Sequence, residues 1–147
     1  MNRTLLIVAL ALLTVSTGCK TPSVTFKSAM LKSLSTNRLD LGLNLDVLNP
    51  NEYEIPINGL DWSLDLFSSK FNNGEIAMSR NIGPAQTTAV AVPIGMSYNA
   101  IAVGVQNLLV KRDIPWGLGG GLSFNLAGQP LRVAYASDGK WRNPLFK

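Results

Sequence analysis

The sequence predicts a mainly β fold, a two-sheet antiparallel β-sandwich with one α-helix near residues 98–111. The first observation is that apolar and polar residues alternate in several segments, as in strands with one buried and one exposed face. The second is that one segment replaces this period of two by spacings of three and four residues. The length of 147 residues favours a single domain, and 46% apolar with 15% charged residues argues against disorder.

The clearest strand is expected at residues 39–47, where every second residue is apolar and the residues between them are small or polar. It ends at Asn49-Pro50-Asn51, because proline has no N–H to donate to a strand ladder. The two asparagine side chains can bond nearby backbone groups, which gives the motif a structural role in a turn.

Later strands follow from the same alternation. Residues 60–66 predict one strand, and the Asn-Asn-Gly of residues 72–74 then predicts a tight turn. Residues 88–96 predict another, in which Pro93 indicates an edge or a bulge. Further segments with this alternation are residues 118–126, residues 131–135 and, more weakly, residues 24–26.

One helix is expected near residues 98–111 because its apolar positions recur every three or four residues. These apolar residues are Tyr98, Ile101, Val105, Leu108 and Leu109. Ser97 is a candidate N-cap, and Lys111 and Arg112 stand at the end where cations suit the helix dipole. Gly104 weakens the helix by up to about 1 kcal/mol relative to alanine.

The first 18 residues have the parts of a secretory signal, with Arg3 before an apolar run at residues 5–13. This run rises only about 14 Å as a helix, roughly half of a hydrocarbon core, which disfavours a spanning anchor. Its end resembles the lipobox of bacterial lipoproteins, with Gly18 before the cleavage point and Cys19 as the lipidated residue. Ser16 departs from the apolar residue usual there, and the alternative is an ordinary signal followed by a free thiol.

The lipobox resemblance divides the chain into a signal peptide at 1–18, a lipidated tether at 19–22 and one domain at 23–147. The membrane is then a partner through acylated Cys19, and two or three acyl chains make release negligible at about 0.8 kcal/mol per buried methylene. Lys20 stands where an aspartate would indicate inner-membrane retention. By analogy with lipoprotein sorting, we expect the periplasmic face of the outer membrane of a bacterial cell envelope.

The composition favours a protein that is not an enzyme. The absence of histidine removes the commonest general base and the commonest metal ligand, and no cofactor or metal is expected. The glycine-rich residues 117–121 lack the pattern of a phosphate loop and instead predict a bulge or a close backbone contact. Asp61 and Asp65 lie too far apart on one strand for a glycosidase pair. The scattered basic residues form no stripe for nucleic acid.

The order of several motifs resembles the type 2 late-embryogenesis-abundant family, whose unit is the water-stress and hypersensitive-response (WHy) domain. The similar segments are Asn49-Pro50-Asn51, residues 55–60, Trp62-Ser63-Leu64, Gly74 and residues 90–94, and the resemblance covers residues 23–136. It implies a β-sandwich like immunoglobulin or fibronectin type III domains, a link to desiccation and stress tolerance, and no catalytic centre. Bacterial domains of this kind also occur as lipoproteins, in agreement with Cys19.

A cation site is the alternative role for the Asn-Pro-Asn turn. Asp46, Asn49, Asn51, Glu52 and Glu54 all offer the oxygen ligands that Ca²⁺ accepts, but nothing there matches the spaced acidic loop of an EF-hand. No metal site is therefore expected at this turn.

Three functional classes remain open. The first is a stress-protective envelope protein that contacts membranes or proteins, as the family resemblance implies. The second is a carrier of lipid or another apolar ligand, with Tyr98, Ile101 and Val105 as candidate lining, although such residues more often fill a core. The third is a structural adaptor of an envelope complex. Its expected contacts are Trp116, Trp141 and Phe146 at the surface.

Overall fold

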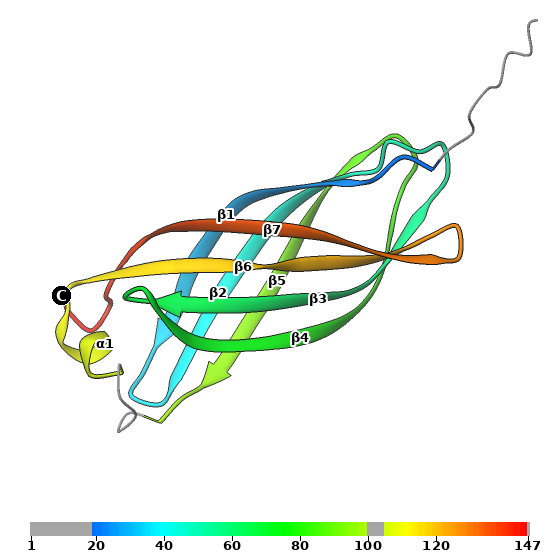
Figure 1. Ribbon diagram of the computed structural model, residues 1–147. Coiled ribbons are helices and arrows are strands. Elements are labelled where there is room, and N and C mark those ends of the chain that lie inside the picture. The colour runs from blue at the N-terminus through cyan, green and yellow to red at the C-terminus, as the bar shows by residue number, and fades with distance from the viewer. Residues whose placement is uncertain (1–18, 100–104, 147) are drawn as a thin grey trace, which may run out of the picture.

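The computed structural model describes residues 19–99 and 105–146, which form seven strands and one short helix. In chain order these are β1 (Ser23–Leu34), β2 (Arg38–Leu48), β3 (Ile55–Leu66), β4 (Ser69–Ile82), β5 (Thr87–Ser97), α1 (Gln106–Val110), β6 (Asp113–Leu126) and β7 (Gln129–Arg142). One sheet has the order β1-β2-β5 and the other β4-β3-β6-β7, and every pairing is antiparallel (Figure 1). The prediction of a two-sheet antiparallel sandwich is confirmed.

The core lies between the sheets and is built by the alternation seen in the sequence. The five apolar residues of β2 from Leu39 to Val47 are at most 1% exposed. The alternate residues of β3 and β5, one strand from each sheet, are also buried. Pro93 lies in β5, an edge strand of the three-stranded sheet, as predicted, and edge strands are where proline is tolerated in sheets.

The two sheets are joined along one open side by contacts between β1 and β7. The indole Nε1 of Trp141 donates a hydrogen bond of 2.9 Å to the carbonyl oxygen of Ala29, and the ring stacks on Trp116 with centroids 5.2 Å apart. The buried apolar residues extend from Ala29 to Trp141, so a chain that begins at Lys20 contains the whole described core.

The helix is shorter than the sequence predicts. Helix α1 covers only Gln106–Val110, whereas residues 98–111 were expected, and part of that range, residues 100–104, lies outside the described residues. Ser97 is the last residue of β5 rather than an N-cap, because the strand pairs with β2 up to that point. The Tyr98 N–H then bonds the turn between β1 and β2, which holds the chain extended. No helix in the two described ranges is long and apolar enough to cross a bilayer.

The predicted turn at residues 72–74 is wrong, because these residues lie within β4. The strands β3 and β4 instead meet at Phe67 and Ser68, whose φ angles of 52° and 63° make a tight left-handed turn. Gly74 is needed inside the strand, since a Cβ atom there would lie 2.8 Å from the ring of Trp62 on β3. The ring of Trp62 on the neighbouring strand therefore requires glycine at position 74.

Candidate functional site

The connections between strands gather at two opposite ends of the sandwich, and both ends carry buried asparagine residues (Figure 1). The N-terminal end holds the start of β1, the β2–β3 connection and the β4–β5 connection. The α1 end holds α1, the start of β6 and the C-terminal tail at residues 143–146.

Asn49 is fully buried at the N-terminal end and joins the two connections there. Its side-chain Nδ2 lies 2.7 Å from the carbonyl oxygen of Tyr53, 3.1 Å from that of Ile82 and 3.2 Å from that of Gly83. Its Oδ1 accepts the N–H of Asn51 at 3.0 Å, which closes an Asx turn around Pro50. One amide thus satisfies backbone groups from two loops that are distant in the sequence.

Asn51 holds the chain that precedes β1. Its Oδ1 accepts the N–H of Lys20 at 2.8 Å, and its Nδ2 donates to the carbonyl oxygen of Lys20 at 2.7 Å. The two bonds resemble those of a hydrogen-bonded residue pair in an antiparallel sheet, where both the N–H and the C=O of one residue are bonded. Pro22, two residues later, is buried. The Asn-Pro-Asn motif therefore fixes the segment that leads into β1.

Cys19 is the first described residue and its thiol is exposed. The hydroxyl of Tyr53 donates a hydrogen bond of 2.8 Å to Cys19 Sγ. This bond raises the pKa of the Tyr53 phenol above its ordinary value, and partial burial adds to the effect. The phenol therefore stays protonated at neutral pH and remains a donor. Gly18, the predicted residue before cleavage, lies outside the described residues.

Four of the five oxygen donors considered for a cation site at this turn are engaged by other groups. Asp46 pairs with Lys27 at 3.4 Å, and Glu54 accepts a long hydrogen bond of 3.5 Å from Asn81. The amides of Asn49 and Asn51 bond backbone, as described above. Across residues 19–99 and 105–146, no group of three or more Cys, Asp or Glu side chains is placed to hold a metal ion.

The residues predicted to line an apolar site lie near the α1 end. Tyr98 is half-buried, its ring meets Phe71 edge-on with centroids 5.4 Å apart, and its hydroxyl donates to the carbonyl oxygen of Ser35. Val105 is 5% exposed and belongs to the hydrophobic core just before α1. Ile101 lies outside the described residues. A ligand between these side chains remains a prediction.

Asn143 is a second fully buried asparagine, at the α1 end, which the sequence analysis missed. Its Nδ2 donates to the carbonyl oxygens of Leu108 at 2.7 Å and Lys111 at 2.8 Å, and its Oδ1 accepts the N–H of Leu145 at 3.0 Å. These bonds tie α1 to the C-terminal tail. The signal was available, because Asn143-Pro144 repeats the dipeptide that begins the Asn-Pro-Asn motif.

The prediction that three aromatic residues are exposed as contacts of an adaptor is wrong for two of them. Trp116 and Trp141 are 8% and 7% exposed, because the ring of Phe26 and the backbone of β1 cover them. Phe146 is half-buried. The large apolar side chains exposed at the α1 end are instead Val110 and Leu145, at 62% and 44%.

The glycine-rich segment makes the close backbone contact that the sequence predicts. A Cβ atom at Gly120 would collide with the carbonyl oxygen of Asp61 on β3. The hydroxyl of Tyr135 on β7 reaches across Gly120 and donates to the same oxygen at 2.8 Å. Burial raises the pKa of Tyr135, and the nearby Asp61 charge adds to the shift, so the phenol acts as a fixed donor.

On the outer face of the same sheet, Arg132 holds the carboxylate of Asp61 through two hydrogen bonds of 2.7 and 2.8 Å. These bonds lower the pKa of Asp61, and the carboxylate stays ionised and paired at neutral pH. Farther along the same sheet, Gly117 and Gly119 leave an open hollow of about 550 Å³ that is also lined by Asp65 and Asp138. The arrangement offers ion pairing and solubility rather than proton transfer.

Known proteins share this fold and part of this sequence. The late embryogenesis abundant protein Lea14-A of Gossypium hirsutum is 25% identical over 107 residues, which are 73% of this chain and 71% of that protein. The solution structure of AT1g01470 from Arabidopsis thaliana superposes with a TM-score of 0.69 at 20% identity, covering 88% of this chain and 87% of that one. At2g46140.1, a candidate late embryogenesis abundant protein, superposes with a TM-score of 0.69 at 24% identity over 84% and 72% of the two chains.

A match to a family model shows which family this chain belongs to. The family model described as late embryogenesis abundant protein, LEA_2, matches residues 44–144, which include the Asn-Pro-Asn motif and extend to Asn143-Pro144. Proteins of this family are stress-related and generally non-enzymatic. The buried turns and the seven-stranded sandwich described above thus belong to a chain that is a member of the LEA_2 family of late embryogenesis abundant proteins.

Proposed function

We propose that this LEA_2 protein is a non-catalytic lipoprotein of a bacterial cell envelope, held at the membrane by acylated Cys19. Its domain protects the envelope in desiccation or related stress through contacts with membranes or proteins. The stress role follows the family, and the anchor follows the lipobox-like sequence that ends at Gly18 and Cys19.

The observation that carries the proposal is the pair of hydrogen bonds between Asn51 and the backbone of Lys20. They hold the residue that follows Cys19 against the sandwich and leave the sulfur exposed at the N-terminal end. A thioether sulfur remains a weak acceptor, so Tyr53 can keep its bond to Cys19 Sγ after lipidation. In this proposal the Asn-Pro-Asn motif has a second role besides its turn, which is to hold the domain next to its anchor.

The proposed location is the periplasmic face of the outer membrane. The residue after the acylated cysteine is Lys20, whose side chain is exposed because only its backbone is held by Asn51. Lys20→Asp is expected to retain the protein in the inner membrane of a Gram-negative host, and membrane fractionation measures the change. Lys32→Asp is the matched control, because it makes the same charge change at an exposed position of β1 away from the anchor.

The anchor is tested by acyl labelling in growing cells and by the intact mass of the purified protein. The wild-type chain is expected to carry label and the mass of two or three acyl chains, and Cys19→Ala to carry neither. Since Cys19 is the single cysteine of the chain, no second thiol can take its place. Label that persists in Cys19→Ala disproves the anchor.

The protective role is tested by drying or osmotically shocking cells that lack the gene. Survival is expected to fall, to be restored by the wild-type gene, and to be restored only in part by Cys19→Ala, which keeps the domain but loses the membrane. Equal survival with and without the gene rejects protection. Full rescue by Cys19→Ala separates protection from the anchor.

A further inference from the structure

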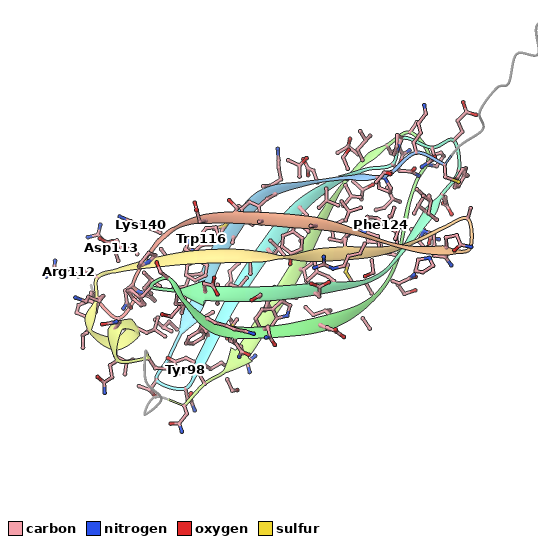
Figure 2. The ribbon with its side chains drawn as sticks, in the orientation of Figure 1. Tyr98, Arg112, Asp113, Trp116, Phe124 and Lys140 are labelled. Atoms are coloured by element: carbon pink, nitrogen blue, oxygen red, sulfur yellow. The ribbon has the colours of Figure 1, made fainter. Side chains whose placement is uncertain are left out.

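Four basic side chains gather at the α1 end, where Figure 2 labels two of them, Arg112 and Lys140. Lys111 and Arg112 link α1 to β6, and Lys140 and Arg142 lie at the end of β7. The strand register places Arg142 opposite Asp113 and Lys140 opposite Pro115, so the two pairs come together where β6 begins. All four side chains are exposed.

These charges are not neutralised by ion pairs. The three salt bridges found among the described residues use the cations of Lys27, Arg38 and Arg132, none of which belongs to this group. The acidic side chains beside the group on the same two strands are Asp113 and Asp138. Asp65 of β3 lines the same hollow as Asp138 and Lys140, so four cations against three carboxylates leave a local charge of 4 − 3 = +1.

Two exposed apolar side chains stand next to the cations. Val110 precedes Lys111 and is 62% exposed, and Leu145 follows Arg142 by three residues and is 44% exposed. We call this surface the basic tip, and it consists of Val110, Lys111, Arg112, Lys140, Arg142 and Leu145.

The basic tip is held in shape before any partner arrives. Asn143 bonds the carbonyl oxygens of Leu108 and Lys111 and the N–H of Leu145, and its own N–H donates to the Arg112 carbonyl oxygen at 2.8 Å. These bonds fix the backbone on either side of the exposed residues. Little backbone entropy is therefore lost when the surface binds.

We propose that the basic tip binds an anionic lipid surface. Cations attract phosphate headgroups, and apolar side chains beside them enter the boundary between headgroups and acyl chains, which is the combination that interfacial binding requires. Nucleic acid would use the cations but gains nothing from exposed Val110 and Leu145, so the lipid surface fits the whole patch better.

The position of the tip indicates which membrane it meets. Strand β7 has 14 residues, so it separates the two ends by about 45 Å at roughly 3.3 Å per residue. Asn51 holds Lys20 at the other end. The tip is thus directed to a second lipid surface rather than to the one that carries the anchor. This orientation rests on the proposed acylation of Cys19, whereas the affinity of the tip for lipid does not.

Lipid binding is tested with residues 20–147, which contain the whole described core and no acyl chain. The purified domain is floated with vesicles of phosphatidylcholine alone or of phosphatidylcholine mixed with phosphatidylglycerol. Binding is expected only with the anionic lipid and is expected to weaken as salt is added. Equal binding to both vesicles, or binding to neither, overturns the proposal.

Matched variants locate the binding surface. Lys111→Gln/Arg112→Gln is expected to lower the partition coefficient roughly 30-fold, which corresponds to about 1 kcal/mol for each lost cation. Lys27→Gln/Arg80→Gln removes the same charge from other strands and is expected to change the coefficient less than about threefold. Equal losses in the two variants would mean that net charge, and not the tip, drives binding. Circular dichroism checks that each variant is folded.

The apolar side chains have their own test. Val110→Ser/Leu145→Ser is expected to lower the partition coefficient about tenfold, since part of each side chain leaves an apolar environment. Met30→Ser is the control, because Met30 is 51% exposed on β1. A duplex DNA is titrated in parallel. Tighter binding to DNA than to vesicles, lost in the Lys111→Gln/Arg112→Gln variant but kept in Val110→Ser/Leu145→Ser, identifies nucleic acid and rejects the lipid surface.

The orientation is tested with the full acylated protein in vesicles that are mixed with separate anionic vesicles. Bridging, measured by light scattering, is expected for the wild type and is lost with Lys111→Gln/Arg112→Gln. Acylated protein that fails to bridge vesicles, while the 20–147 domain binds them, overturns the second-surface orientation. Absence of acyl mass on Cys19 rejects the proposed anchor instead and leaves the lipid binding of the tip intact.

Discussion

Replacing Asn49 by alanine removes the side chain that joins the two connections at the N-terminal end. Asn49 is 0% exposed, and its amide lies within 3.2 Å of three carbonyl oxygens and accepts one backbone N–H. A buried group left without a partner costs about 1–3 kcal/mol, while a group that water reaches costs less. Counting the Ile82 carbonyl and the Asn51 N–H as the deeply buried partners gives an expected loss of about 3 kcal/mol.

The measurement is urea unfolding of the 20–147 domain followed by circular dichroism and tryptophan fluorescence. The midpoint is expected to fall with an unchanged denaturant slope, which reports lost stability rather than a changed unfolded state. Asn73→Ala is the matched control, because Asn73 is exposed on β4 and its change is expected to stay within about 0.5 kcal/mol. If Asn49→Ala loses no more stability than Asn73→Ala, the amide does not hold the two loops together and the argument for the motif is wrong.

Three further predictions concern other contacts. Asn51→Ala is expected to speed hydrogen exchange of the Lys20 amide, measured by NMR on residues 19–147, with a global loss of only about 1 kcal/mol; unchanged exchange would contradict the role given to this asparagine. Gly120→Ala is expected to cost about 3 kcal/mol or more in urea unfolding because its Cβ meets backbone, whereas at Gly119 alanine has ordinary contacts; equal effects would refute the distinction. The pKa of Asp61 is lowered in the folded state, so its contribution to the free energy of unfolding is present above its unfolded pKa and is lost as the pH falls through the lower folded pKa. Asp61→Asn is therefore expected to flatten the acid side of the plot of unfolding free energy against pH. An unchanged plot would count against the ion pair.

The strands were predictable because their burial follows from the local alternation. Residues 39–47 can face only one way in a sheet, and a slip of one residue would expose every buried leucine of β2. The same argument holds for β3, where Leu60, Trp62 and Leu64 are buried as expected. Pro93 was informative for a similar reason, since its missing N–H allows few positions in a sheet.

The features that were not predictable depend on contacts between distant segments. Gly74 reads locally as a turn residue, yet it lies in β4 because the ring of Trp62 needs its space. Trp141 reads locally as an exposed residue near a terminus, yet the Ala29 carbonyl, which precedes it by 112 residues, accepts its N–H in the interior. The end of β5 at Ser97 depends on pairing with Arg38, which the helical spacing after it does not reveal.

In the candidate site too, features set by the local sequence were predictable and contacts between distant segments were not. The sequence was sufficient to give the Asn-Pro-Asn motif a structural role, because asparagine beside proline favours turns that bond their own backbone. It could not show that Asn51 would hold the chain 31 residues earlier, since neither Lys20 nor its neighbours carry a matching signal. Asn143-Pro144 could have been found from the repeated dipeptide, although not its bonds to α1.

The two Asn-Pro turns place buried amides at both ends of the sandwich. In each turn Oδ1 accepts the N–H two residues later at 3.0 Å, and Nδ2 holds carbonyl oxygens of another segment. The hydrophobic core keeps the middle of a sandwich rigid, but loops beyond it are the parts that open first. Because both turns are fixed to the core, the proposed anchor segment and the basic tip stay at a set separation and direction. The proposed bridging of two lipid surfaces depends on that geometry, so Asn143→Ala is expected to weaken vesicle bridging although the charges of the tip are intact.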